Sequence, residues 1–310
     1  MQIRPQEAEA ILRNVRVLDG GLATELEYLG ADISGPLWSA HILESDPEMI
    51  LAVHRAYIAA GADCIASASY QVSRMGYAEI GLPPERADAA MTRSVALARR
   101  AAAQFPQRQI LVAASLGPYG AALHNGAEYH GNYACSFDDL VQFHRERIAV
   151  LAHATGAEAP DLLAFETLPS LQEARAIGVA LAPWPSLAAW FSFTAKNAAH
   201  VAHGEPLRDC ASYVAGLPQT AAIGVNCVAP AFLTDAICEL RKAVSKPLIV
   251  YPNSGEEWDA RQRRWMGSND PTGFGDLAAG WFAAGAQIVG GCCRTRPEHI
   301  RQIARVAPRS

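Results

Sequence analysis

Three cysteines stand at the ends of two short apolar stretches, in a pattern that indicates a metal site. Ala286 to Val289 is followed by Gly290-Gly291-Cys292-Cys293, and Ala221 to Val225 is followed by Asn226-Cys227. Adjacent cysteines bridge each other only with strain, but both can reach one ion where glycines let the backbone bend and approach closely. Soft thiolates favour Zn²⁺, and three protein ligands leave the fourth tetrahedral position open for a substrate.

Other roles for these cysteines stay open on the residues alone. A cysteine on an apolar strand is commonly a small buried hydrophobic residue, and we expect this for the isolated cysteines at positions 64, 135, 210 and 238. Cys292 and Cys293 could instead form a redox pair. Because Cys227 is remote from Cys292 in the sequence, the trio is one site only if the fold brings two strand ends together.

The composition is that of a large globular chain without a nucleic-acid or membrane signature. Half of the 310 residues are hydrophobic, and the net charge of -5 comes from interspersed acidic and basic residues. No apolar run approaches the roughly 18 residues that span a bilayer, and residues 1–15 lack the apolar core of a signal peptide. Seven cysteines, an odd number, argue against a disulfide framework and predict a reducing, cytoplasmic location.

Short apolar runs recur along the chain and predict the strands of a parallel sheet. Each run is continuous rather than alternating, which is typical of strands covered on both faces. The eight predicted strands are Val15 to Leu18, Cys64 to Ser69, Ile110 to Leu116, Leu162 to Phe165, Ala188 to Phe193, Ala221 to Val225, Leu248 to Tyr251, and Gln287 to Val289.

Helical patterns lie between these runs. Residues 46–60 predict a helix with Asp46 as N-cap and Pro47 in its first turn, and Ser136 with Asp139 predicts a capping box at the start of 137–154. Glycines 61, 156 and 285 each precede a predicted strand and fit the left-handed position that ends a helix. Eight strand–helix repeats without a linker predict one (β/α)₈ TIM barrel of the α/β class, rather than an open doubly wound sheet.

Residues at the carboxyl ends of barrel strands converge on one mouth, so the cysteines should meet other polar groups there. The first strand ends in Asp19-Gly20-Gly21 and the fourth in Glu166-Thr167. The two carboxylates could act as an acid/base pair or hold a cationic group, although each could also simply cap a helix. We expect Gly20 and Gly21 to clear side-chain bulk where a ligand approaches the backbone.

Aromatic residues are frequent in the loops that should surround this mouth. They are Tyr70, Tyr119, Tyr129, Tyr133, Tyr251, Trp258, Trp265 and, in the first loop, Trp38. Aromatic faces attract cations, particularly onium groups that cannot donate hydrogen bonds. The stretch from Gly117 to Ser136 is long for a connection inside a compact domain, which indicates a functional loop.

Together these motifs resemble a known family, the zinc-dependent homocysteine S-methyltransferases, and most closely the type that uses S-methylmethionine. The resemblance covers about Val15 to His299 and is carried, in order, by Asp19 to Leu26, Pro36 to Ala40, Ser69 to Gln71, Leu116 to Ala121, Phe165 to Pro169, Trp190 to Thr194, Gly224 to Cys227, Tyr251 to Glu256 and Gly290 to Thr295.

The resemblance implies a single homocysteine-binding (β/α)₈ barrel domain over residues 1–310. It implies one Zn²⁺ held by Cys227, Cys292 and Cys293, a homocysteine amino group near Asp19 and Glu166, and a methyl donor bordered by Trp38. We expect Gly20, Gly21 and Asn226 to complete the substrate site. The implied reaction transfers a methyl group from S-methylmethionine to the homocysteine thiolate, giving methionine. S-adenosylmethionine is the alternative sulfonium donor, and betaine is a third donor to test.

Two further expectations concern function class and assembly. A thiol-based redox or zinc sensor would bind zinc without methyl transfer, but it has no use for the carboxylates Asp19 and Glu166. We expect small-molecule substrates, with neither nucleic acid nor membrane as partner. The chain ends soon after its last predicted helix, which leaves no extra arm, so a monomer is expected.

Overall fold

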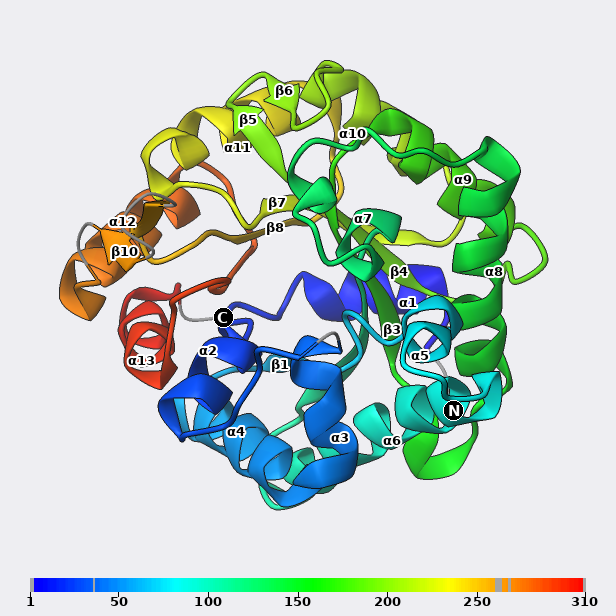
Figure 1. Cartoon of the computed structure of the whole chain (residues 1–310). Helices are drawn as coiled ribbons and strands as arrows, with labels where there is room; N and C mark the ends of the chain where they lie inside the picture. Colours follow the sequence, from blue (N-terminus) through cyan, green and yellow to red (C-terminus); the bar gives the residue numbers. More distant parts are fainter. Residues whose placement is uncertain (1–2, 36, 260–263, 267–268, 309–310) are drawn as a thin grey trace.

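The core of the protein is a curled sheet of seven parallel strands whose spatial order follows the chain (Figure 1). The computed structural model describes residues 3–35, 37–259, 264–266 and 269–308. The strands of the sheet are β1 (Cys64–Ala66), β2 (Leu111–Leu116), β3 (Leu162–Leu168), β4 (Ala189–Phe193), β7 (Thr220–Asn226), β8 (Leu248–Tyr251) and β11 (Ile288–Val289). Seven of the eight predicted strands are therefore confirmed.

The first predicted strand is reduced to two bridging residues between the sheet's ends. Val17 forms a parallel bridge with Val289 of β11, and Leu18 forms one with Cys64 of β1. The segment is short because the backbone N–H groups of Arg16 and Val17 donate to the Asp63 carboxylate, at 3.2 and 3.1 Å, instead of to a neighbouring strand.

Helices surround the sheet in a ring and connect successive strands (Figure 1). The ring contains α4 (Pro47–Ala60), α6 (Pro84–Ala102), α8 (Phe137–His153), α9 (Leu171–Leu181), α10 (Leu207–Ala215), α11 (Leu233–Ala243), α12 (Pro271–Ala283) and α13 (Pro297–Val306). Shorter α-helices are α1 (Pro5–Leu12), α2 (Leu22–Tyr28), α3 (Ile42–Ser45), α5 (Arg74–Glu79) and α7 (Tyr119–Ala122). The 3₁₀ turns are η1 (Trp38–His41), η2 (Ala127–Tyr129), η3 (Gly156–Glu158) and η4 (Pro230–Phe232), and two small hairpins pair β5 (Ala195–Asn197) with β6 (His200–Val201) and β9 (Glu257–Asp259) with β10 (Arg264–Met266).

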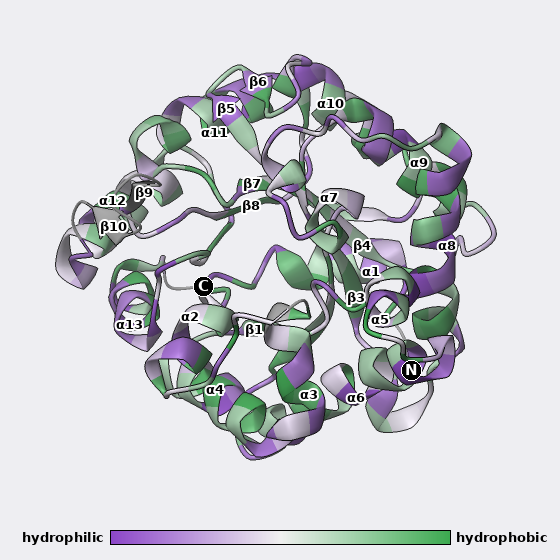
Figure 2. Cartoon of the chain, viewed as in Figure 1, coloured by the Kyte–Doolittle hydropathy of each residue, from purple (hydrophilic) through white to green (hydrophobic). Residues whose placement is uncertain are grey.

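The hydrophobic core has two layers, one on each face of the sheet. In β3, Leu163 and Phe165 pack in the layer shared with the helices, whereas Leu162 and Ala164 pack in the layer enclosed by the sheet. Leu12 of α1 belongs to the enclosed layer. Helices of the ring carry both hydrophilic and hydrophobic residues, as amphipathic helices do (Figure 2). Strands buried on both faces explain the continuous apolar runs in the sequence.

Most of the predicted helix signals are confirmed. The Asp46 side chain accepts a hydrogen bond from the backbone N–H of Met49, and Ser136 with Asp139 forms a capping box. Gly61 and Gly285 have φ of 120° and 110° and follow α4 and α12. Gly156 also has a positive φ, but it begins the turn η3, because α8 already ends at His153. Within the described residues, no helix is long and apolar enough to cross a membrane.

Candidate metal centre and substrate pocket

The three predicted cysteines meet at the carboxyl ends of two strands. Cys227 follows β7, and Cys292 and Cys293 follow β11. Their Sγ atoms lie within 4.8 Å of one another, and those of Cys227 and Cys293 are 3.6 Å apart. Because a disulfide needs a sulfur–sulfur distance of about 2.05 Å, the thiols are free. The prediction that the fold brings these cysteines together is confirmed.

Strand β8 lies between β7 and β11 and its end holds all three cysteine amides. The backbone N–H of Cys227 donates to the carbonyl of Tyr251 at 3.2 Å, and that of Cys292 to the carbonyl of Pro252 at 2.8 Å. The N–H of Cys293 donates to the Asn253 side-chain oxygen at 3.2 Å. Cys227 adopts the left-handed conformation, with φ of 55°. Three consecutive residues of one strand end therefore fix the relative position of the thiols.

The glycines of the site make room for neighbouring protein atoms, a packing role that the sequence argument did not foresee. A Cβ on Gly21 would lie 2.5 Å from the carbonyl oxygen of Cys292, and one on Gly20 would lie 2.8 Å from the Tyr57 ring. Gly290 and Gly291 are as tightly packed, against Asp19 and Thr295. Both Gly20 and Gly21 line the pocket described below, but their missing side chains allow the first loop to contact the cysteine loop.

Asp19 and Glu166 are both buried beside the thiols. A carboxylate oxygen of Asp19 accepts from the backbone N–H of Ala66 at 2.9 Å. Glu166 accepts a short hydrogen bond from the Ser115 hydroxyl. Burial raises the pKa of Asp19 well above its usual value, and the nearby Glu166 charge raises it further. Burial also raises the pKa of Glu166 to about 7, although hydrogen bonds from Ser115 and Tyr251 oppose the rise.

The Asn226 side chain makes two hydrogen bonds with Thr167. Its side-chain oxygen accepts from the backbone N–H of Thr167 at 2.8 Å, and its Nδ2 donates to the Thr167 hydroxyl at 2.8 Å. Thr167 has φ of 60°, a strained conformation for a β-branched residue. Asn226 lines the pocket, but its described contacts hold the end of β3, where Glu166 lies.

The long loop after β2 is anchored by a residue that the sequence analysis missed. Buried Glu173 of α9 accepts from the backbone N–H of Tyr119, from the Tyr133 hydroxyl at 2.8 Å and from the His144 ring at 3.0 Å. The same loop carries Tyr129, whose hydroxyl lies 3.4 Å from the Sγ of Cys227. In the sequence, Glu173 resembles an ordinary acidic residue in the first turn of a helix.

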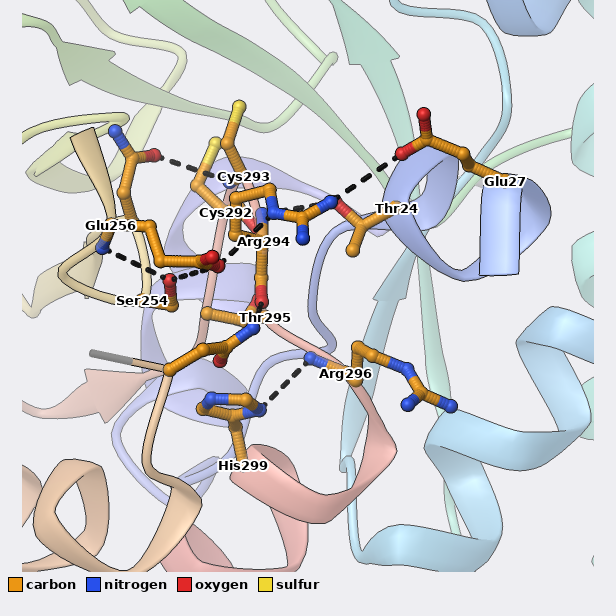
Figure 3. Close-up of polar contacts among 12 residues, drawn as sticks. Thr24, Glu27, Ser254, Glu256, Cys292, Cys293, Arg294, Thr295, Arg296 and His299 are labelled. Atoms are coloured by element: carbon orange, nitrogen blue, oxygen red, sulfur yellow. Dashed lines mark hydrogen bonds and ion pairs between the residues drawn. The ribbon is translucent and has the colours of Figure 1, made fainter. Parts of the chain in front are cut away.

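Arg294 ties the cysteine loop to its surroundings (Figure 3). Its backbone N–H donates to the Thr24 hydroxyl at 2.9 Å, and its guanidinium pairs with Glu256 at 3.0 Å and Glu27 at 3.5 Å. Its φ is 65°. These contacts bind the residue after Cys293 both to α2 and to the segment after β8.

The cysteines and carboxylates line one pocket of about 670 Å³. Tyr70, Gln71, Tyr129 and Tyr251 line it as well, together with Glu128. Trp38 begins η1, but its side chain lies outside the described residues, as do the side chains of Trp258 in β9 and Trp265 in β10. Among the isolated cysteines, positions 64 and 210 are buried as predicted, 135 is half-buried, and 238 is exposed.

Hydrogen bonding among the three thiols favours one thiolate, at Cys293. Hydrogen bonds from Cys227 and Cys292 lower the pKa of Cys293 well below its usual value, whereas the pKa values of Cys227 and Cys292 are raised because hydrogen bonding among the thiols and burial favour their protonated forms. Around a tetrahedral Zn²⁺ with bonds of about 2.3 Å, sulfur atoms lie about 3.8 Å apart. The distance of 3.6 Å between the Sγ atoms of Cys227 and Cys293 is close to this spacing. The three thiols could together hold one metal ion.

The chain is similar to known proteins over nearly its whole length. A family model described as homocysteine S-methyltransferase matches residues 16–307. A homocysteine S-methyltransferase of Bacillus subtilis is 46% identical over 93% of both chains, and one of Escherichia coli is 43% identical over 97% of this chain and 98% of that one. The crystal structure of the metallated form of an Escherichia coli homocysteine methyltransferase has a TM-score of 0.85 at 40% identity, covering 97% of this chain and 99% of that chain.

Proposed function

This chain belongs to the homocysteine S-methyltransferase family, and we propose that it transfers a methyl group from S-methylmethionine to the sulfur of homocysteine, giving methionine. The observation that carries this proposal is the meeting of three thiols and two buried carboxylates in one pocket of about 670 Å³. Thiols can hold a metal that activates a substrate sulfur, and carboxylates can hold the ammonium group of an amino acid.

We further propose that residues 1–310 form a single (β/α)₈ barrel domain whose sheet is closed by the segment at Val17 and Leu18. The support is the pair of parallel bridges that this segment forms with β11 and with β1. A closed barrel also explains the enclosed core layer, to which inward-facing residues of several strands contribute.

Cys227, Cys292 and Cys293 would hold one Zn²⁺ per chain. An alkyl thiol has an ordinary pKa near 8.5, so homocysteine is mostly protonated at neutral pH. When bound, Zn²⁺ would lower the pKa of the homocysteine thiol. The chain itself fixes the positions of the three thiols, because the backbone amides of these cysteines donate hydrogen bonds to residues at the end of β8. Because these thiols must stay reduced, we also propose a cytoplasmic location.

Asp19 and Glu166 would bind the homocysteine ammonium group. Both carboxyl groups have raised pKa values because burial disfavours their charged forms. A substrate cation beside them would favour ionisation, so binding of the ammonium group and release of protons are coupled. Asn226 would act indirectly, by holding Thr167 and hence the end of β3 that presents Glu166.

The reaction is a single displacement. The homocysteine sulfur forms a bond to the methyl carbon while the donor's sulfur–methyl bond breaks, and the electron pair of that bond neutralises the donor sulfonium. With S-methylmethionine, both products are methionine. Opposite charges disappear as the reaction proceeds, which a pocket shielded from water favours. Holding the reacting atoms about 3–3.5 Å apart and in line supplies further acceleration.

The donor is tested by steady-state rates of methionine formation at fixed homocysteine. We expect the highest kcat/KM with S-methylmethionine, a lower value with the bulkier S-adenosylmethionine, and the lowest with betaine, which carries its methyl group on nitrogen. Cys292→Ala serves as a control that should form no methionine. A preference for betaine would contradict the proposed donor, and failure of all three donors with the zinc-loaded protein would contradict the proposed function.

A further inference from the structure

Two buried oxygen atoms line the pocket without a hydrogen-bond partner among the described residues. They are Oε2 of Glu128 and Oε1 of Gln71. A buried acceptor left without a donor destabilises the folded state, and does so more strongly if it is charged. Such atoms therefore mark places where a ligand supplies the missing donors.

The two residues come from neighbouring loops. Gln71 follows β1, and Glu128 lies in η2, in the loop that follows β2. The amide nitrogen of Gln71 donates to the carbonyl of Ala121 at 3.2 Å, which leaves its oxygen as the free acceptor. No ion pair to Glu128 occurs in the part of the chain that the structure describes.

Glu128 comes from a different segment of the chain than the other two carboxylates of the pocket. It lies in the loop after β2, whereas Asp19 follows the bridging residue Leu18, and Glu166 lies in β3. Burial raises the pKa of Tyr70, and the charges of Glu128 and Glu166 raise it further. The pocket thus has carboxylates from three segments around one sulfur cluster.

We propose that Glu128 and Gln71 form a binding site for the α-ammonium group of the methyl donor, which makes the donor a sulfonium compound that is also an amino acid. An ammonium group has three N–H donors, so it can donate one hydrogen bond to Glu128, one to Gln71 and one to a further acceptor. The inference rests on the proposed function, in which the other acidic position, at Asp19 and Glu166, takes the ammonium group of homocysteine.

A carboxylate is better placed on the ammonium group than on the sulfonium. The sulfonium loses its charge in the reaction, so a carboxylate beside it would stabilise the ground state more than the transition state. The ammonium charge does not change, so Glu128 stabilises both states equally. Such uniform binding appears in KM and leaves kcat unaltered.

The test compares two donors in Glu128→Gln, a substitution that keeps the shape of the side chain and removes its charge. One donor is S-methylmethionine and the other is γ-(dimethylsulfonio)butyrate, which is the same molecule without its amino group. We expect Glu128→Gln to raise KM for S-methylmethionine by roughly 10- to 100-fold, as for loss of a charged hydrogen bond. We expect no change in kcat, and no change in KM for the desamino donor.

Two controls separate binding from folding. Glu48→Gln removes an exposed carboxylate of α4, which lies outside the pocket and pairs with Arg100, and should behave like the wild type with both donors. The melting temperature and zinc content of Glu128→Gln should also match those of the wild type. Calorimetric titration of S-methylmethionine without homocysteine measures donor binding even if no methyl transfer occurs.

Equal losses with both donors would overturn the proposal, because Glu128 would then act on the sulfonium or on the structure of the loop. An unchanged affinity for S-methylmethionine would overturn it as well. Failure of the proposed function is distinct, because it appears as wild-type protein that forms no methionine, whatever the effect of Glu128→Gln on donor binding.

Discussion

Strained backbone is concentrated at the residues that shape the pocket. Four non-glycine residues in the described part of the chain have a positive φ. Thr167, Cys227 and His124 line the pocket, and Arg294 follows Cys293. Each such conformation costs on the order of 1–3 kcal/mol and persists only where neighbours hold it. Asn226 holds Thr167, and the carbonyl of Tyr251 holds the amide of Cys227.

Glu166 predicts a specific pH dependence of stability. Its pKa is about 7 in the folded protein and ordinarily 4.5, so between these values the folded state binds more protons than the unfolded state. The free energy of unfolding should therefore fall as pH rises from about 4.5 to 7, by roughly 2–3 kcal/mol from this group. The glutamine side chain in Glu166→Gln does not titrate, so this variant should not lose this free energy of unfolding as the pH rises.

The measurement is urea unfolding of metal-free, reduced wild type and Glu166→Gln at about pH 5 and pH 8. Asp19 also has a raised pKa, which the Glu166 charge raises further, so the difference between the two proteins reports the ionisation of Glu166 together with its effect on Asp19. If the free energy of unfolding of the wild type changes with pH no more steeply than that of Glu166→Gln, Glu166 is ionised over the whole pH range measured.

The residue-scale features could be predicted only in part from sequence. The Cys227 and Cys292-Cys293 motif identified the thiol cluster because its chemistry follows from residue type. The open acceptors of Glu128 and Gln71 had no such signal, since a single polar residue in a loop is normally solvated. The hydrogen bonds between Asn226 and Thr167 depend on the left-handed backbone conformation of Thr167, which is unfavourable for a β-branched residue and is therefore not expected from the sequence.

At the scale of elements, the site depends on contact between the first loop and the cysteine loop. Gly21 lies at this contact. Its N–H donates to the Thr295 hydroxyl at 3.1 Å, and its carbonyl oxygen accepts from the Tyr57 hydroxyl at 3.0 Å. A Cβ at this position would meet the Cys292 carbonyl at 2.5 Å, and backbone cannot give way as a flexible side chain can.

Gly21→Ala should therefore displace the cysteine loop. We expect a loss of stability of about 1–3 kcal/mol, as for overpacking. Zinc affinity should fall roughly 10- to 100-fold, as when the residues that orient metal ligands are altered. Competition with a fluorescent chelator measures the affinity. Gly280→Ala, a helical glycine with open space around its Cβ position, is the matched control and should bind zinc normally. Equal affinities in the two variants would contradict this role for Gly21.

Element boundaries followed the sequence where local signals were strong. The cap at Asp46 and the capping box at Ser136 were predicted because side chains there bond to amides within the same turn. The length of the first strand was overestimated. The carboxylate of Asp63, forty-seven residues after Arg16, accepts hydrogen bonds from backbone N–H groups that would otherwise pair with a neighbouring strand. Contacts between distant segments, such as Glu173 with the loop after β2, leave no local trace.

At the scale of the whole molecule, parallel strands in chain order explain how distant residues make one site. Carboxyl ends of β3, β7 and β11 all open on the same pocket, which brings Glu166, Cys227 and Cys293 together. The alternation of apolar runs and helices was enough to predict this convergence. The ammonium site proposed at Glu128 and Gln71 was not predictable, because it depends on which loop atoms remain without partners once the chain has folded.

The central claim is that three cysteines hold one zinc ion and leave a position for the homocysteine sulfur. Zinc K-edge X-ray absorption of the purified protein tests it most directly, with Cys292→Ala as the control for zinc content. We predict three sulfur ligands at about 2.3 Å without substrate and a fourth when homocysteine is added. Stoichiometric zinc retained in Cys292→Ala, or a sulfur count that homocysteine does not change, would contradict the account.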